Sequence, residues 1–351
     1  MKTEDLTAPS YQDLRPYKQP TSKTFPVYPD LVDRLVKAKH RPDDDLRFVM
    51  AVCSSYAYGD TATVAMMMAC LGLEENHCLM VTEYVDVLFL TSTAYLIQSR
   101  DGRVVILCYR GTPPTSLITW LTDLEVNPVK IGMQLPVGSG TPDEYDVHGG
   151  FYRNVRSTRP QIIGALEQAI EGYSVRSDGG KLDHKLEALY ITGHSLGGAS
   201  AAMLSAMLIA DSDYQPIVAK LKAAYTFGAP MIGSPDFAHA CNDIDFLRDN
   251  VIRYVYANDV VPQVPPTESG QFEHFGQELQ YKPAGNRGQW RPSRTTQTSN
   301  LFGIVTTPVS FLAKQFPVAR NIPFHTSIND HLPQYYIDAL TPARVRSEFG
   351  D

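Results

Sequence analysis

The stretch Ala188-Leu-Tyr-Ile-Thr-Gly-His-Ser195-Leu-Gly-Gly198 continues into the small-residue run Ala199–Ala210. An apolar run that ends in Gly-x-Ser-x-Gly and precedes a helical pattern predicts a strand, a sharp turn and a helix. The turn strains the backbone of its serine, so Gly193 and Gly197 must lack bulky side chains. We therefore predict that Ser195 is a nucleophile presented at the end of a sheet, beside a helix N-terminus that favours developing negative charge. The alternative is a glycine-rich turn that only joins a strand to a helix.

Strand and helix patterns alternate along the rest of the chain, and the turn Arg100-Asp-Gly-Arg103 between two β-rich runs is a strong hairpin signal. A helical pattern begins at Leu31, and further helices are predicted over Leu46–Tyr56, over Ala62–Leu73 and near Arg159–Tyr173. The predicted strands are Val85–Thr91, Thr93–Gln98, Val104–Tyr109, Ala188–Thr192, Ala223–Phe227 and Val251–Tyr256, and 113–150 is expected to be rich in loops. This alternation predicts an α/β protein with a mainly parallel central sheet flanked by helices. The chemistry of such sheets lies outside the carboxyl ends of the strands.

The composition describes an ordinary globular chain. Its 351 residues are 43% hydrophobic and 20% charged, which argues against disorder, collagen and coiled coil. A formal net charge of −7 argues against a nucleic-acid or anionic-membrane partner held by charge. Five cysteines without CxxC spacing predict reduced, buried thiols, with one surface disulfide as the alternative. No His/Cys/Asp cluster has metal-ligand spacing, so neither a metal nor an organic cofactor is expected.

The N-terminal region carries no periodic pattern. Residues 1–30 are rich in Pro, Tyr, Lys and Thr and predict an extended arm, followed by a single domain over 31–351. The polar start without an apolar core segment predicts no classical signal peptide, and no apolar run is long enough to span a bilayer. The expected location is the cytoplasm, or outside the cell by a leaderless route, or the chain is a mature form given a new Met. No pattern indicates an oligomeric state.

Six motifs in order now support a resemblance that covers roughly Ala51 to Leu340. They are Tyr109-Arg-Gly-Thr112, Val147-His-Gly-Gly-Phe151, Thr192–Gly198, Tyr225-Thr-Phe-Gly-Ala-Pro230, Asn258-Asp-Val-Val-Pro262 and a late Asp330-His331. In this order the sequence resembles the class 3 (fungal-type) triacylglycerol lipases of the α/β-hydrolase fold. The resemblance implies a serine carboxylester hydrolase that cleaves fatty-acyl esters of acylglycerols at a lipid–water interface through an acyl-enzyme.

The nucleophile needs a base, and the base needs an acid that holds its tautomer. By resemblance the base is His331, which also completes the chain order Ser, Asp, His. His325 is the alternative base, while His194, His148 and His274 are expected to support or pack around the site. The acid is predicted at Asp259, which follows the strand Val251–Tyr256; a structural turn is the alternative reading, and Asp236 and Asp330 are weaker candidates.

An oxyanion hole must await the charge that acyl transfer places on the carbonyl oxygen. The first donor is expected to be the backbone N–H of Leu196, which follows the nucleophile. The resemblance implies a second backbone N–H from Thr112, whose hydroxyl helps to orient the oxyanion.

Two further segments are expected near the mouth of the site. In 113–124, Leu117, Trp120, Leu121 and Leu124 form an amphipathic stripe, and the family places a lid here. Leu117, Ile118, Trp120 and Leu121 are the predicted lid or substrate-contact residues, unless this is an ordinary core-facing helix. The insertion 282–324 departs from the compact family pattern and could form a cap, a second lid, an acyl-chain wall or ordinary surface packing.

Two classes of alternative function remain open: related ester hydrolases and a non-catalytic protein. Phospholipase A1, galactolipase, feruloyl esterase and short-chain esterase share the same skeleton, and their head-group choice depends on loops. A non-catalytic lipase-like protein that only binds a lipid or a partner is the alternative from another class.

Overall fold

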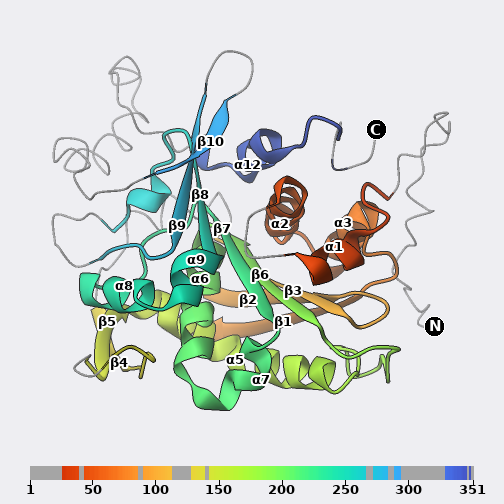
Figure 1. Cartoon of the computed structure of the whole chain (residues 1–351), viewed down its shortest axis with the longest axis horizontal. Coiled ribbons are helices and arrows are strands. Elements are labelled where there is room, and N and C mark those ends of the chain that lie inside the picture. Colours follow the sequence, from red (N-terminus) through yellow and green to blue (C-terminus); the bar gives the residue numbers. More distant parts are fainter. Residues whose placement is uncertain are drawn as a thin grey trace.

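The computed structural model describes residues 26–38, 43–85, 90–112, 128–138, 142–265, 272–283, 288–293, 329–345 and 348. Its centre is an eight-stranded sheet in the order β1-β2-β3-β6-β7-β8-β9-β10 (Figure 1). These strands are β1 (His77–Val85), β2 (Leu90–Gln98), β3 (Val104–Tyr109), β6 (Ala188–His194), β7 (Leu221–Phe227), β8 (Val251–Tyr256), β9 (Gln277–Lys282) and β10 (Gln289–Pro292). From β3 to β9 neighbouring strands in the sheet are parallel, whereas β1–β2, β2–β3 and β9–β10 are antiparallel pairs. The predicted mainly parallel central sheet is confirmed.

Helices cover both faces of this sheet (Figure 1). One layer consists of α1 (Leu31–Lys37), α2 (Asp44–Tyr56), α3 (Thr61–Leu71) and α12 (Pro333–Leu340). The other consists of α5 (Gly149–Ile170), α6 (Leu196–Ala210), α7 (Gln215–Val218), α8 (Pro235–Asn242) and α9 (Asp245–Asn250). Short 3₁₀ turns are η3 (Ser212–Tyr214), η4 (Val261–Gln263) and η7 (Asn329–His331).

Strand β3 shows why the central strands are continuously apolar. All six of its residues are buried, and its side chains alternate between the two helical layers. Val104, Ile106 and Cys108 belong to the core on the α2 side, and Val105, Leu107 and Tyr109 to the core on the α5 and α6 side. A strand buried on both faces needs apolar residues at every position rather than at alternate ones.

The predicted hairpin and reduced cysteines are confirmed, since β2 and β3 pair across the turn at Asp101-Gly102 and all five cysteines are buried and free. The predicted strand Val85–Thr91 is wrong. The first edge strand is β1, which ends at Val85, and β2 begins only at Leu90. The β1 pattern is interrupted by polar side chains such as Thr82 and Glu83, because an edge strand is partly solvated.

The loop-rich prediction for 113–150 is also wrong in part. Strands β4 (Pro128–Gly132) and β5 (Glu144–His148) form a separate two-stranded antiparallel sheet. Helix α5 begins directly after it at Gly149, well before the predicted start near Arg159. Two glycines at its start and Pro160 in its interior are signals that argue against a helix. The Nδ1 atom of His148 caps the helix by accepting a hydrogen bond from the Gly150 amide (3.2 Å).

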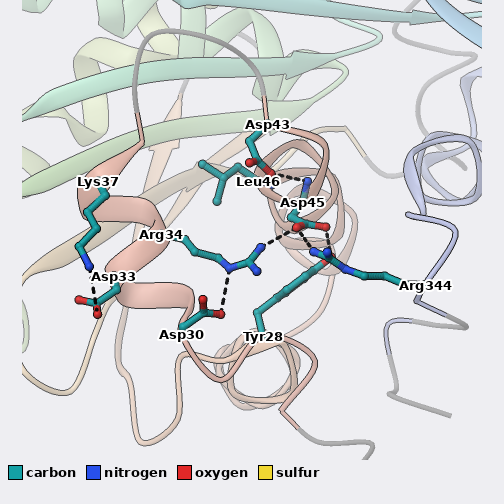
Figure 2. Close-up of polar contacts among 9 residues, drawn as sticks. All are labelled: Tyr28, Asp30, Asp33, Arg34, Lys37, Asp43, Asp45, Leu46 and Arg344. Carbon is teal, nitrogen blue, oxygen red and sulfur yellow. Dashed lines mark hydrogen bonds and ion pairs between the residues drawn. The ribbon is translucent and has the colours of Figure 1, made fainter.

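A buried carboxylate joins the N-terminal helices to the C-terminal segment (Figure 2). Asp45, on α2, accepts hydrogen bonds from the Tyr28 hydroxyl (3.1 Å), from Arg34 Nη1 on α1 (2.5 Å) and from Arg344, which follows α12. Arg34 also donates to Asp30 (2.9 Å). This cluster ties the chain after α12 to the helical layer on one face of the sheet.

Several predicted features lie outside the described residues: most of the arm 1–30, the lid 113–124 with Leu117, Ile118, Trp120 and Leu121, and most of the insertion 282–324. The described start of that insertion contains β10, which was not predicted. None of the helices in the described ranges is long and apolar enough to cross a bilayer.

Candidate active site

Ser195 occupies the turn between β6 and α6 in a strained backbone conformation. Its φ of 59° and ψ of −130° are unusual for a residue with a side chain. Both predicted glycines are required there. A Cβ on Gly193 would lie 2.3 Å from the Gly197 carbonyl, and a Cβ on Gly197 would lie 2.2 Å from the Tyr109 carbonyl oxygen. The turn presents Ser195 at the carboxyl end of the sheet, at the first turn of α6.

Asp259 and His331 meet at the same edge, although they lie far apart in the sequence. Asp259 follows β8 and is fully buried, and the His331 ring, at the end of η7, is almost fully buried. Nδ1 of His331 lies 2.8 Å from Oδ2 and 3.0 Å from Oδ1 of Asp259. A carboxylate at this distance keeps the proton on Nδ1 and leaves the lone pair on Nε2.

Phe227 and Gly228 connect Ser195 to this pair. The amide of Ser195 donates to the Phe227 carbonyl (2.9 Å). The next residue, Gly228, lies against the acid and base: a Cβ there would be 2.7 Å from Asp259 Oδ2 and 2.9 Å from Nδ1 of His331. The end of β7 thus brings the predicted nucleophile, acid and base into one corner.

The predicted oxyanion residues belong to the same corner. Thr112 follows β3 and is buried, and its neighbour Gly111 approaches the elbow so closely that a Cβ on it would lie 2.5 Å from the His194 carbonyl oxygen. Leu196 is the first residue of α6, so no earlier turn of the helix can accept a hydrogen bond from its amide. Leu196 thus follows Ser195 directly, and the loop that carries Thr112 packs against the elbow through Gly111.

Three buried polar atoms of this corner have no hydrogen-bond partner within the described chain. They are Oγ of Ser195, Nε2 of His331 and Oγ1 of Thr112. Buried polar atoms are normally paired, so an unpaired group calls for a functional explanation. Here the three atoms are the ones that the reaction would use as nucleophile, base and oxyanion donor.

The other candidate histidines have structural partners. His148 stacks on Phe151 with ring centroids 4.1 Å apart, and burial together with Arg153 lowers the pKa of its imidazole to about 4. Nε2 of His274 lies 2.8 Å from the Pro262 carbonyl oxygen, and burial lowers its pKa well below the ordinary value. His194 bonds at both ring nitrogens, and His325 lies outside the described residues.

The weaker acid candidates also lie elsewhere. Asp236 is in the first turn of α8. Oδ2 of Asp330 accepts from the amide of Asn258 (3.0 Å), so this side chain ties the neighbour of the base to the neighbour of the acid. Among the described residues, no group of three or more His, Cys, Asp or Glu side chains is placed to hold a metal ion.

Two tyrosines at the site were not predicted from the sequence. The Tyr336 hydroxyl donates to Oδ2 of Asp259 (2.6 Å), and the Tyr58 hydroxyl lies 2.8 Å from Nδ1 of His194. Both contacts join residues distant in sequence, and no local motif marks either tyrosine.

Known proteins are similar to parts of this chain. The profile of the family described as lipase (class 3) matches residues 106–269. Triacylglycerol lipase OBL1 from Ricinus communis is 30% identical over 241 residues, which are 59% of this chain and 43% of the relative. Phospholipase A1-II 1 from Oryza sativa subsp. indica is 29% identical over 177 residues, 46% of this chain and 40% of the relative. The chain therefore spans less than half the length of these two plant relatives.

The similarity to a solved structure covers more of this chain than the family profile does. The triacylglyceride lipase of Rhizomucor miehei superposes with a TM-score of 0.55 at 21% identity, covering 82% of this chain and 92% of the other. At this identity the match shows the α/β-hydrolase fold. Together with the profile match and the plant relatives, this fold supports the assignment of the chain to the class 3 lipase family.

Proposed function

We propose that this chain is a serine carboxylester hydrolase, a lipase that cleaves fatty-acyl esters of acylglycerols. The observation that carries the proposal is the convergence of three unpaired buried atoms, Oγ of Ser195, Nε2 of His331 and Oγ1 of Thr112, beside the His331–Asp259 pair. The names of the plant and fungal relatives support the same chemistry.

The geometry implies a two-step acyl transfer. Ser195 Oγ attacks the ester carbonyl carbon while Nε2 of His331 takes the hydroxyl proton, and Asp259 stabilises the imidazolium that forms. The carbonyl oxygen becomes an oxyanion that accepts hydrogen bonds from the amides of Leu196 and Thr112 and from the Thr112 hydroxyl. As the tetrahedral intermediate collapses, His331 gives its proton to the departing alcohol and an acyl-enzyme remains.

Water completes the cycle. His331 takes a proton from a water molecule, which attacks the acyl carbon, and the same proton returns to Ser195 Oγ as the fatty acid leaves. Over one turnover the alcohol carries away the proton that Ser195 loses, and water supplies the proton that replaces it.

The test measures hydrolysis of p-nitrophenyl esters of increasing chain length and of emulsified triacylglycerol by the wild type and by S195A. We expect S195A to lose at least about 10³-fold in kcat. S205A is the matched control, because Ser205 lies on the same helix and its hydroxyl donates only to the Ala201 carbonyl (2.8 Å). Equal rates for the wild type and S195A would overturn the proposal.

The same assay separates the related activities. The similarity to the rice phospholipase A1 makes phosphatidylcholine vesicles the second substrate to test. Preferred release of fatty acid from these vesicles would indicate a phospholipase, and preference for soluble butyrate without a gain on emulsions would indicate an esterase. Lipid binding without any hydrolysis would indicate a non-catalytic lipase-like protein.

A further inference from the structure

His194 immediately precedes the nucleophile, and its buried ring is hydrogen-bonded at both nitrogens. Nε2 lies 2.8 Å from the carbonyl oxygen of His331, and Nδ1 lies 2.8 Å from the Tyr58 hydroxyl. A carbonyl oxygen only accepts, so Nε2 must carry the hydrogen; Nδ1 must then accept from the Tyr58 hydroxyl. The ring is therefore a neutral connector with a defined tautomer.

The surroundings keep this tautomer in place. Burial, together with the nearby His331 ring at a centroid distance of 4.5 Å, lowers the pKa of His194 well below its ordinary value. Burial raises the pKa of Tyr58, so its hydroxyl stays a donor. A second positive charge at His194 would also oppose the imidazolium that forms on His331 during the reaction.

Tyr58 extends the connection to the oxyanion loop. It lies between α2 and α3, before the part of the chain that matches the family profile. A Cβ on Gly111 would lie 2.2 Å from the Tyr58 hydroxyl oxygen, so this tyrosine packs directly against the residue that precedes Thr112. One hydroxyl thus touches both the oxyanion loop and the elbow histidine.

The turn that carries the base needs such support. His331 ends η7, a 3₁₀ turn of three residues, and a turn this short makes few hydrogen bonds of its own. The His331 side chain is oriented by Asp259, whereas its backbone carbonyl is held by His194. Side-chain orientation and backbone position are therefore set by different residues.

We propose that Tyr58 and His194 are positioning residues, and that the hydrogen-bond chain from Tyr58 through His194 to the His331 carbonyl sets the distance between base, nucleophile and oxyanion loop. The inference rests on the proposed function. It assigns a role in the site to a segment outside the matched region and to a histidine that does not itself exchange the proton.

Two substitutions of His194 test its two hydrogen bonds separately. In H194Q the amide N–H replaces the Nε2 donor to His331, and in H194N the amide oxygen replaces the Nδ1 acceptor from Tyr58. We expect H194N to have a kcat at least about tenfold below that of H194Q, with KM changed by less than about twofold, because a displaced base slows the chemical step rather than binding. Because Gln also fills more of the imidazole volume than Asn, the Tyr58 variant below, which keeps the ring and removes only a hydroxyl, separates hydrogen bonding from space filling.

Tyr58 is tested by removal of its hydroxyl alone. We expect Y58F to lower kcat by about three- to tenfold and to slow the labelling of Ser195 by a serine-directed alkylphosphonate by the same factor. The matched control is Y56F, which loses a neighbouring hydroxyl that donates to Glu348 (3.0 Å) instead; its kcat should equal that of the wild type. If H194N does not fold, judged by its thermal unfolding, Y58F decides.

The outcomes distinguish this inference from the proposed function. A wild type that neither hydrolyses esters nor reacts with the phosphonate would overturn both. An active wild type with equal kcat for H194Q and H194N, or with unchanged kcat in Y58F, would overturn only the positioning role.

Discussion

Tyr336 donates its hydroxyl hydrogen to Oδ2 of Asp259 across 2.6 Å, the same oxygen that lies 2.8 Å from Nδ1 of His331. The tyrosine is on α12, in the helix that follows the base, and its oxygen accepts from the amide of Tyr256 (3.1 Å). Burial and the adjacent Asp259 raise the pKa of Tyr336, so the hydroxyl remains a donor. The buried carboxylate is thus shared between the base and a second, permanent donor.

The variant Y336F removes that donor and leaves Oδ2 of Asp259 with the His331 Nδ1–H. Hydrogen bonds to charged groups contribute about 1.5–3 kcal/mol, so we expect the free energy of unfolding to fall by about that amount and kcat/KM to fall by about three- to thirtyfold. Urea unfolding and ester hydrolysis measure the two effects. Y335F is the control, because the exposed Tyr335 acts by stacking its ring on Tyr256. Wild-type stability and kcat/KM in Y336F would contradict the assigned role.

Gly228 offers a test of how closely the acid and base are packed. Its φ is 59°, and an added Cβ would lie 2.7 Å from Asp259 Oδ2 and 2.9 Å from the His331 ring. We therefore expect G228A to displace the base and to lower kcat by about 100-fold, more than backbone strain alone would produce. The measurement is kcat on a p-nitrophenyl ester, at a temperature where thermal unfolding shows the variant to be folded.

Gly180 supplies the matched control for that substitution. It has a similar φ of 66°, and a Cβ there would meet nothing within 4 Å. G180A should therefore show the stability change of about 1 kcal/mol expected for a left-handed backbone and a kcat equal to that of the wild type. Equal kcat losses in both variants would show that strain, rather than displacement of His331, causes the effect.

The sequence was most informative where the chemistry depends on neighbouring residues. The elbow at Ser195 needs glycines at fixed offsets, and the strand Val251–Tyr256, which precedes Asp259, appears with the predicted bounds. His331 and Thr112 were identified through family motifs, and the fold places both beside the elbow. These assignments rely on short-range patterns that a single sequence displays.

The supporting contacts could not be predicted in this way. Tyr58 bonds a ring 136 positions away, and Tyr336 bonds a carboxylate 77 positions away. The chain has 19 tyrosines, and nothing local distinguishes these two. Short or exposed strands were missed for another reason: β10 (Gln289–Pro292) is polar and mostly exposed, so it lacks the apolar pattern that marks a buried strand.

His148 makes a prediction about stability and pH. Burial lowers its pKa to about 4 from 6.5, so between these values the unfolded chain binds a proton that the folded protein excludes. The free energy of unfolding should therefore fall as pH drops from 6.5 towards 4, with His148 contributing at most about 3 kcal/mol. The contribution is fully present above pH 6.5, is lost progressively as pH falls from 6.5 to about 4, and does not change further below that.

The variant H148N isolates this contribution, because an Asn oxygen can still cap α5 at the Gly150 amide while it does not titrate. Loss of stacking on Phe151 should lower stability by a constant amount at every pH. Urea unfolding at pH 7 and at pH 4.5 should show a smaller pH-dependent loss in H148N than in the wild type. Identical losses in the two proteins would mean that His148 is not the group responsible.

The Asp45 cluster predicts a stability effect without an effect on chemistry (Figure 2). D45N keeps the shape of the side chain but removes the charge that Arg34 and Arg344 share, while Arg34 retains its contact with Asp30. Because both guanidinium groups are partly exposed, we expect the free energy of unfolding to fall by only about 1–2 kcal/mol, and by less at high salt.

The control for D45N is E171Q, which breaks an exposed pair with Lys185 whose side chains are 67% and 68% exposed. Such pairs contribute little, so its unfolding free energy should stay within about 0.5 kcal/mol of the wild type. D45N should keep the wild-type kcat wherever it is folded, because the cluster secures the chain after α12 and makes no contact with Asp259 or His331. A loss of kcat in folded D45N would instead show that disturbing the cluster displaces α12 and, with it, His331.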